Sequence, residues 1–147
     1  MIDTDVDGGI ELIESFPAVD TYRMLRAAAG MLPKTLEAAE RGLRNTLYGV
    51  SLRHAGGTIG MGRIIGDGGC FFIVVDIAVL PAWQGKGLGT RVMTALDAWL
   101  RVHVPESAYV SLVADGDAKH LYAKFGFVET APAAVNMEYV MGPETER

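Results

Sequence analysis

The stretch PAWQGKGLGTRVMTALDAWL, residues 81–100, has glycine at positions 85, 87 and 89 and then continues directly into an apolar-periodic segment. From residue 88 onward, apolar residues recur with the spacing of one helix face, whereas positions 91, 94, 97 and 101 are polar. The first backbone N–H groups of a helix have no partner inside it, and glycines let an anion approach the main chain. The stretch therefore predicts either a diphosphate-binding turn or simply a tight strand-to-helix turn, and the glycines alone leave both open.

Two other phosphate-binding loops are excluded by the residues around this turn. A P-loop needs a glycine five residues before the Gly-Lys pair and Ser or Thr after the lysine, but Leu80 and Gly87 occupy those positions. The dinucleotide fingerprint Gly-x-Gly-x-x-Gly fails because Thr90 replaces its third glycine and the motif falls past the middle of the chain. A nucleoside triphosphatase and a Rossmann oxidoreductase are both disfavoured.

Hydrophobic periodicity and turn residues predict the order of elements along the chain. Thr35 is expected to open one helix and Gly30 to close another. The expected elements are a strand at 9–15, helices at 18–30 and 35–46, strands at 47–54, 58–66 and 70–80, a helix from 88, a strand at 108–114, a helix at 118–125 and a final strand at 135–141. The strand at 70–80 is apolar on both faces, as in a central buried strand. Because a helix separates it from 108–114, these two strands should run parallel in an otherwise antiparallel sheet.

Composition narrows the class of protein. The chain has 147 residues, 50% of them hydrophobic, and a formal net charge of -5, which predicts a single domain over 1–147 without a nucleic-acid partner. No apolar run approaches the roughly 20 residues of a membrane span, and the N-terminus is acidic, so we expect no membrane partner and a cytoplasmic location. The single cysteine, Cys70, excludes an internal disulfide and a zinc site built on paired cysteines, and no metal is expected.

Two motifs together resemble one family. The segment QGKGLG, residues 84–89, matches the Gln/Arg-x-x-Gly-x-Gly/Ala motif of the Gcn5-related N-acetyltransferases, and AKHLYAKFGF, residues 118–127, is similar to their A-x-x-L-Y-x-K-x-GF segment. The close resemblance covers about residues 57–128, and the element order extends it over the chain. It implies an α+β fold, with a mostly antiparallel central sheet, a splayed parallel strand pair and about four flanking helices.

The resemblance also implies a co-substrate, acetyl-CoA. Its pyrophosphate would be bound at the turn by residues Gln84, Gly85, Lys86, Gly87, Leu88, Gly89 and Thr90. The pantetheine arm would pair with the backbone of Ile77, Ala78 and Val79. Many family members carry Asn where this chain has Asp115, and an ionised Asp cannot donate a hydrogen bond to the pantetheine. Asp115 or Asp117 could instead cap the helix that begins near residue 118, and Asp117 is the better candidate.

Two residues are candidate catalysts. Asp76 is the one ionisable side chain in the run at 70–80 and could accept the proton of an attacking amine, or could sit at a β-bulge or accept backbone bonds. The family's base positions on this strand fall at Ile73 and Val75, which are apolar here. Tyr122 lies on the apolar face of its short helix and could be a core residue, but the resemblance implies that it protonates the departing CoA thiolate.

The sequence supports two hypotheses of different kinds. The first is an N-acetyltransferase in which a primary amine of a small molecule or peptide attacks acetyl-CoA directly. The second is a module of the same fold that binds or senses acyl-CoA without turnover. The acceptor is not identified by the sequence, and a homodimer formed through an edge strand is possible in either case.

Overall fold

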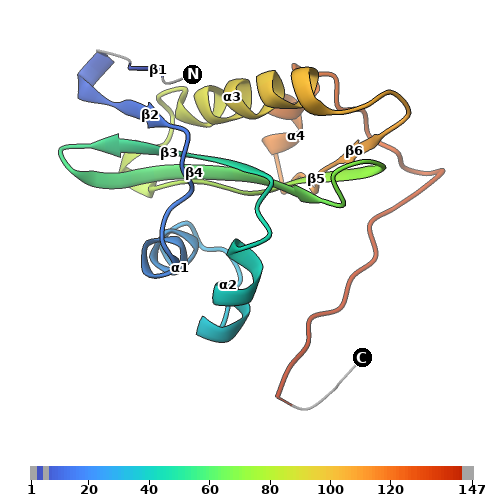
Figure 1. The fold of residues 1–147 in the computed structure, drawn as a ribbon, viewed down its shortest axis with the longest axis horizontal. Helices are drawn as coiled ribbons and strands as arrows, with labels where there is room; N and C mark the ends of the chain where they lie inside the picture. Colours follow the sequence, from blue (N-terminus) through green and yellow to red (C-terminus); the bar gives the residue numbers. More distant parts are fainter. Residues whose placement is uncertain (1–2, 5–6, 144–147) are drawn as a thin grey trace. The chain divides into compact units, whose positions relative to one another are not determined.

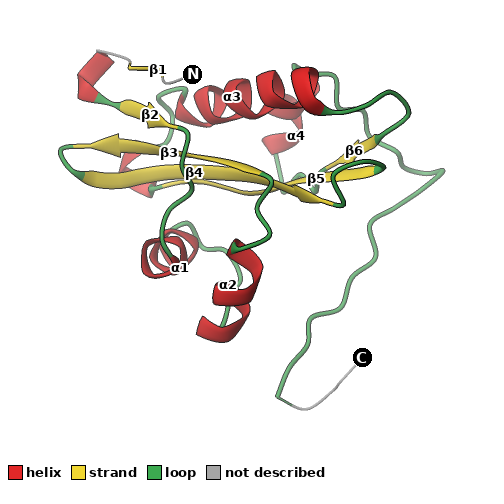
Figure 2. Cartoon of the chain, in the orientation of Figure 1, coloured by secondary structure: helices red, strands yellow, loops and turns green. Residues whose placement is uncertain are grey.

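The computed structural model describes residues 3–4 and 7–143. The chain forms two compact units, 1–112 and 113–147, which are described separately. The elements of the first unit are β1 (Asp3–Thr4), the 3-10 helix η1 (Asp7–Gly9), β2 (Glu11–Ile13), α1 (Val19–Ala28), α2 (Leu36–Leu43), β3 (Tyr48–His54), β4 (Gly57–Gly66), β5 (Phe71–Val79), the 3-10 helix η2 (Pro81–Trp83), α3 (Leu88–His103) and β6 (Tyr109–Ser111). The second unit contains α4 (Ala118–Ala123) (Figure 1; Figure 2).

The first unit is built on one six-stranded sheet in the order β1-β2-β3-β4-β5-β6. All neighbouring strands are antiparallel except β5 and β6, which run parallel. The predicted mixed sheet with one parallel pair is therefore confirmed. Helix α3 lies on one face of the sheet, and α1 and α2 lie on the other (Figure 1).

The ends of α1 and α2 follow the predicted capping residues. Gly30 has φ +76° and closes α1, and the N–H of Met31 returns to the carbonyl of Arg26 at 2.9 Å. Thr35 precedes α2, and its hydroxyl accepts from the N–H of Ala38 at 3.1 Å. The two helices then bury a small apolar face against the sheet, in a cluster of Tyr22, Leu25, Ala39, Met61 and Ala78.

Three predicted strand features are wrong. The segment 135–141 forms no strand, and Met137 is 87% exposed, because apolar alternation produces a strand only where a partner strand supplies the hydrogen bonds. The strand expected at 108–114 is limited to β6. Strand β5 is central but not buried on both faces, since Phe71 is 58% exposed. Helix α1 covers the other end of β5, where Ala78 packs with Tyr22 and Leu25.

A β-bulge interrupts the pairing of β4 with β5. The register passes from Met61 opposite Ala78 to Arg63 opposite Val75, so that Asp76 and Ile77 together face Gly62. Asp76 has φ +59°, a left-handed conformation that Asp tolerates better than most residues. The alternative that placed Asp76 at a bulge is thus confirmed. A Cβ on Gly62 would lie 2.5 Å from Val92 Cγ1 on α3, so glycine lets the helix approach the sheet at the bulge.

We predict that Gly62→Ala lowers the free energy of unfolding by about 1–3 kcal/mol, because the β-branched side chain of Val92 has little freedom to move away. Gly42 lies in α2, where an added methyl group would meet no atom within 4 Å, so Gly42→Ala should raise the same quantity by about 0.5–1 kcal/mol. Urea unfolding of the two variants measures both changes. Equal effects of the two substitutions would contradict the close packing inferred at Gly62.

Candidate active site

The glycine turn places a bare backbone in front of α3. Gly85 and Gly87 have φ values of +78° and +79°, on either side of Lys86, and Gly87 is the N-cap residue of the helix. The N–H of Arg91 bonds to the carbonyl of Gly87 at 3.1 Å, so the N–H groups of residues 88–90 precede the first helical bond. These donors and the positive end of the helix dipole face the same end of α3, which suits an anion.

The space beside the turn is open. A Cβ on Gly85 or Gly87 would meet no atom within 4 Å, so packing does not require glycine at either position. The left-handed conformation favours glycine there, and the open space leaves the backbone accessible. The Gln84 side chain folds back on the main chain. Its Nε2 donates to the carbonyl of Val79 at 2.9 Å and so links the turn to the end of β5.

Strand β5 has an open edge next to this turn. Its pairing with β6 covers only Phe71, Phe72 and Ile73 among the residues that the structure describes. The following stretch of β5, up to Val79, pairs with β4 on one side and with no described strand on the other. The backbone of Ile77, Ala78 and Val79, for which a role in pantetheine binding is predicted, lies in this stretch.

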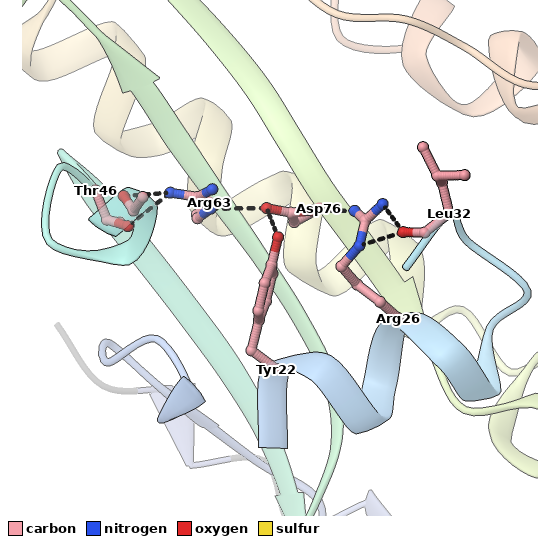
Figure 3. Close-up of polar contacts among 7 residues, drawn as sticks. Tyr22, Arg26, Leu32, Thr46, Arg63 and Asp76 are labelled. Carbon is pink, nitrogen blue, oxygen red and sulfur yellow. Dashed lines mark hydrogen bonds and ion pairs between the residues drawn. The ribbon is translucent and has the colours of Figure 1, made fainter. Parts of the chain in front are cut away.

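Asp76 is buried, with 8% exposure, at the centre of a polar network on the α1 side of the sheet. Its Oδ1 accepts from Arg26 Nη1 at 2.6 Å, and its Oδ2 accepts from Arg63 Nε at 2.7 Å and from the Tyr22 hydroxyl at 3.2 Å (Figure 3). Burial, and then the charge of Asp76, raise the pKa of Tyr22 above its usual value, so the phenol keeps its proton and donates a hydrogen bond to the carboxylate.

The two arginines extend this network to the segment before α2 and to the end of α2. Arg26 donates from Nε at 3.0 Å, and also from Nη2, to the carbonyl of Leu32 in the segment between α1 and α2. Arg63 Nη1 donates to the Thr46 hydroxyl at 3.0 Å and to the carbonyl of Gly42 at 3.3 Å, near the end of α2. The guanidinium of Arg63 also lies over the rings of Phe16 and Tyr22.

The remaining predicted site residues belong to the second unit. Tyr122 lies on α4, and burial, followed by the negative charge of Asp115, raises the pKa of its hydroxyl above the usual value. Its ring meets that of Phe127 edge to face, with centroids 6.5 Å apart. Asp117 occupies the N-cap position of α4, but its side chain makes no capping bond, so the predicted cap is wrong in this respect. The carbonyl of Asp115 accepts from the N–H of Ala118 at 3.1 Å.

The first unit thus brings together Asp76, the open edge of β5 and the glycine turn, whereas the relation of Tyr122 and Asp115 to them stays a prediction. Sequence reasoning missed Tyr22, Arg26 and Arg63. Arginine in the otherwise apolar segment GMGRIIG, residues 60–66, was the available signal, because a charge there needs a buried partner. Within the described ranges, no group of three or more His, Cys, Asp or Glu could hold a metal ion, and no helix is long and apolar enough to cross a membrane.

Comparison with known proteins assigns the chain to a family. The sequence model of the acetyltransferase (GNAT) domain family matches residues 45–129. A solved structure of a protein of unknown function from methicillin-resistant Staphylococcus aureus, described as a probable acetyltransferase, is 45% identical with a TM-score of 0.85, covering 89% of this chain and 98% of that one. The chain belongs to the GNAT acetyltransferase family. Its sheet and helices match the GNAT acetyltransferase structures, which confirms the predicted fold class and resemblance.

Two more distant solved structures share the fold alone. Glucosamine-6-phosphate N-acetyltransferase from Arabidopsis thaliana is 14% identical with a TM-score of 0.64, covering 89% of this chain and 99% of that one. Ribosomal-protein-S18-alanine N-acetyltransferase from Escherichia coli is 20% identical with a TM-score of 0.66, covering 82% of this chain and 79% of that one. One name specifies a sugar phosphate and the other a ribosomal protein, so the fold does not identify an acceptor. A search of functionally curated sequences gave no match.

We predict that Gly87→Asp weakens CoA binding by about 100-fold or more, because like charges placed together cost several kcal/mol. Gly87→Asn is the matched control, since Asn has the same size and also tolerates the left-handed conformation, and it should weaken binding by less than about ten-fold. Isothermal titration calorimetry with CoA measures both. Unchanged affinity in a folded Gly87→Asp protein would mean that this turn does not bind the pyrophosphate.

Proposed function

We propose that this GNAT protein is an acetyl-CoA-dependent N-acetyltransferase that transfers the acetyl group to a primary amine of a small molecule or peptide. One observation carries the proposal: the accessible glycine turn at the start of α3 adjoins the open edge of β5. A diphosphate and an extended, amide-containing arm need these two features side by side. The amine would attack the thioester directly, since Cys70, the one cysteine, is exposed in the β4–β5 turn outside both motifs.

The turn and strand fit CoA in their chemistry. We propose that the main chain of Gln84–Thr90 donates to the pyrophosphate and that Lys86, which is exposed, adds a positive charge. The backbone of Ile77, Ala78 and Val79 would pair with the pantetheine amides along the free edge of β5. Asp115 is proposed to contact the same arm as an acceptor only, because an ionised carboxylate has no proton to donate.

Tyr122 is the proposed general acid. A departing thiolate, whose conjugate acid has a pKa of about 8.5, gains from a positioned proton donor. Burial holds the pKa of Tyr122 above its usual value, so the hydroxyl stays protonated at neutral pH and is available for transfer. Its proton would pass to the CoA sulfur as the bond from that sulfur to the acetyl carbon breaks.

Asp76 is the predicted acceptor of the amine proton. A primary alkylamine with a pKa near 10.4 must lose a proton before it attacks. That Asp76 takes this proton stays a prediction. The two carboxylate oxygens of Asp76 already accept three hydrogen bonds, from Arg26, Arg63 and Tyr22. A base at this position would have to give up at least one of these contacts.

Three broader predictions also stay proposals: one domain over residues 1–147, a cytoplasmic location without nucleic-acid or membrane partners, and a possible homodimer. None of them is needed for the transfer reaction proposed above.

The test of the proposed function is a panel of amines, amino sugars and peptides with acetyl-CoA, with thiol release followed by optical assay and the product identified by mass. Release of CoA together with an acceptor heavier by one acetyl group is the expected result. Tight CoA binding without release for any acceptor would overturn the proposal in favour of an acyl-CoA-binding module.

We predict that Tyr122→Phe lowers kcat by about 100-fold and leaves acetyl-CoA affinity nearly unchanged, because the lost proton transfer matters in the transition state. Tyr109→Phe is the matched control, since Tyr109 is 56% exposed on β6, and it should retain normal turnover. Single-turnover kinetics makes chemistry the measured step. A kcat within about three-fold of the parent for Tyr122→Phe would remove the residue from the mechanism.

The raised pKa of Tyr122 also predicts a pH dependence. A general acid works only while protonated, so the alkaline fall in kcat should lie above the usual range of tyrosine, about pH 10. The charge of Asp115 is the second cause of the raised value, so Asp115→Asn should move this fall toward lower pH. A pH profile of kcat for the parent and Asp115→Asn measures the shift, and a displacement to higher pH would contradict the assignment.

A further inference from the structure

We propose that Asp76 is a positioning residue, which uses Arg26, Arg63 and Tyr22 to hold α1 and α2 (residues 19–43, called the α1–α2 hairpin) over the bulge of β5. In that position the two helices would border the space for the acceptor amine, called the acceptor side. The proposal rests on the proposed acetyl transfer. It explains how α1 and α2 are attached to β5, the strand that would bind the donor.

The network joins three separate elements through one carboxylate. Tyr22 and Arg26 come from α1, Arg63 from β4 and Asp76 from β5, and all four converge in Figure 3. The side chains of Arg26, Arg63 and Asp76 are 9%, 10% and 5% exposed in their ion pairs. Charges this far from water interact strongly and are costly to separate.

The same guanidinium groups hold the chain before α2 and at its end. Arg26 bonds to the carbonyl of Leu32, which precedes the helix, and Arg63 bonds to Gly42 and Thr46 at its other end. Arg26 therefore connects Asp76 to the segment between α1 and α2, and Arg63 connects Asp76 to the end of α2. A single carboxylate fixes the direction of both arginines, and through them the position of α1 and α2 on the sheet.

The charge balance makes this carboxylate indispensable to the hairpin. Two guanidinium groups share one carboxylate, and Tyr22 stays neutral because burial and the charge of Asp76 raise its pKa. Of the described groups that meet in the network, Asp76 is the one anion. Its neutralisation would leave two buried cations close together, which favours movement of α1 away from the sheet.

Neutralising Asp76 should disturb the structure on only one side of the bulge. On the α1 face, Asp76 meets the hairpin, whereas on the other face Gly62 and Ile77 pack near Val92 of α3. The glycine turn belongs to α3 and is attached to β5 by the Gln84 side chain. Loosening the hairpin should therefore disturb the acceptor side and leave the CoA turn in place.

A positioning role and a base role predict different results for Asp76→Asn. Positioning predicts faster hydrogen exchange over residues 19–46 by about ten-fold or more, with exchange in α3 unchanged. It also predicts an acceptor KM raised by about ten-fold or more, with CoA affinity within about three-fold of the parent. A base role predicts unchanged exchange, an unchanged acceptor KM and a kcat lower by about 100-fold.

Two further variants keep the test decisive. Arg26→Lys retains the Asp76 carboxylate but cannot reach Leu32 and Asp76 with one planar fork, so positioning predicts a raised acceptor KM and faster exchange, and a base role predicts neither. In the double variant Asp76→Asn/Arg26→Gln, the second substitution restores the parent's net charge in the network. A positioning role then predicts that the acceptor KM and the exchange rate over residues 19–46 both return part of the way to the parent values.

The measurements use the full chain and the amine with the highest turnover in the acceptor panel. If no amine is acetylated, the proposed function fails, while hydrogen exchange still decides whether Asp76 anchors the hairpin. If an amine is acetylated and exchange over residues 19–46 is unchanged in both Asp76→Asn and Arg26→Lys, the positioning role is wrong.

Discussion

The extra residue in β5 opposite Gly62 determines how both faces of the sheet are covered. At the bulge, consecutive residues serve opposite faces: Asp76 points to α1, and Ile77 packs beside the position of Gly62 near Val92 of α3. A non-glycine residue with φ +59° costs roughly 1–3 kcal/mol when nothing supports it. Here Arg26 and Arg63 bond to the Asp76 carboxylate, so the strained residue and its partners depend on each other.

The network around Asp76 is better understood as a device for specificity than for stability. Buried ion pairs often contribute little net stability, because desolvation offsets the attraction. Their geometry, however, is demanding: the planar guanidinium of Arg26 bonds to Asp76 and to Leu32 at the same time. An apolar replacement could bury as much surface, but it would allow the hairpin to slide over the sheet. On the positioning role proposed above, the ion pairs would favour the observed position of the two helices over others that bury a similar area.

The elements that were predictable from sequence are those with local causes. Gly30 and Thr35 end and begin helices through contacts within four residues of themselves, and the parallel strand pair follows from a helix placed between two strands. The partners of Asp76 lie 50 and 13 residues away for Arg26 and Arg63, and no local pattern encodes such pairing. The apolar alternation at 135–141 failed as a predictor for the converse reason, since strand formation also requires a partner that the segment itself does not specify.

The short connection between β5 and α3 has a consequence for the choice of acyl donor. The N–H of Trp83 bonds to Leu80, that of Gln84 to Pro81, and the Gln84 side chain to Val79, so the strand end and the helix start are held at a set separation. If the diphosphate binds at the turn and the reacting carbonyl lies near the bulge, as proposed, the fixed distance between these two places would select donors by the length of their arm. A thioester on a shorter arm could occupy either end but not both, and selection by length would then require no contact with the acyl group itself.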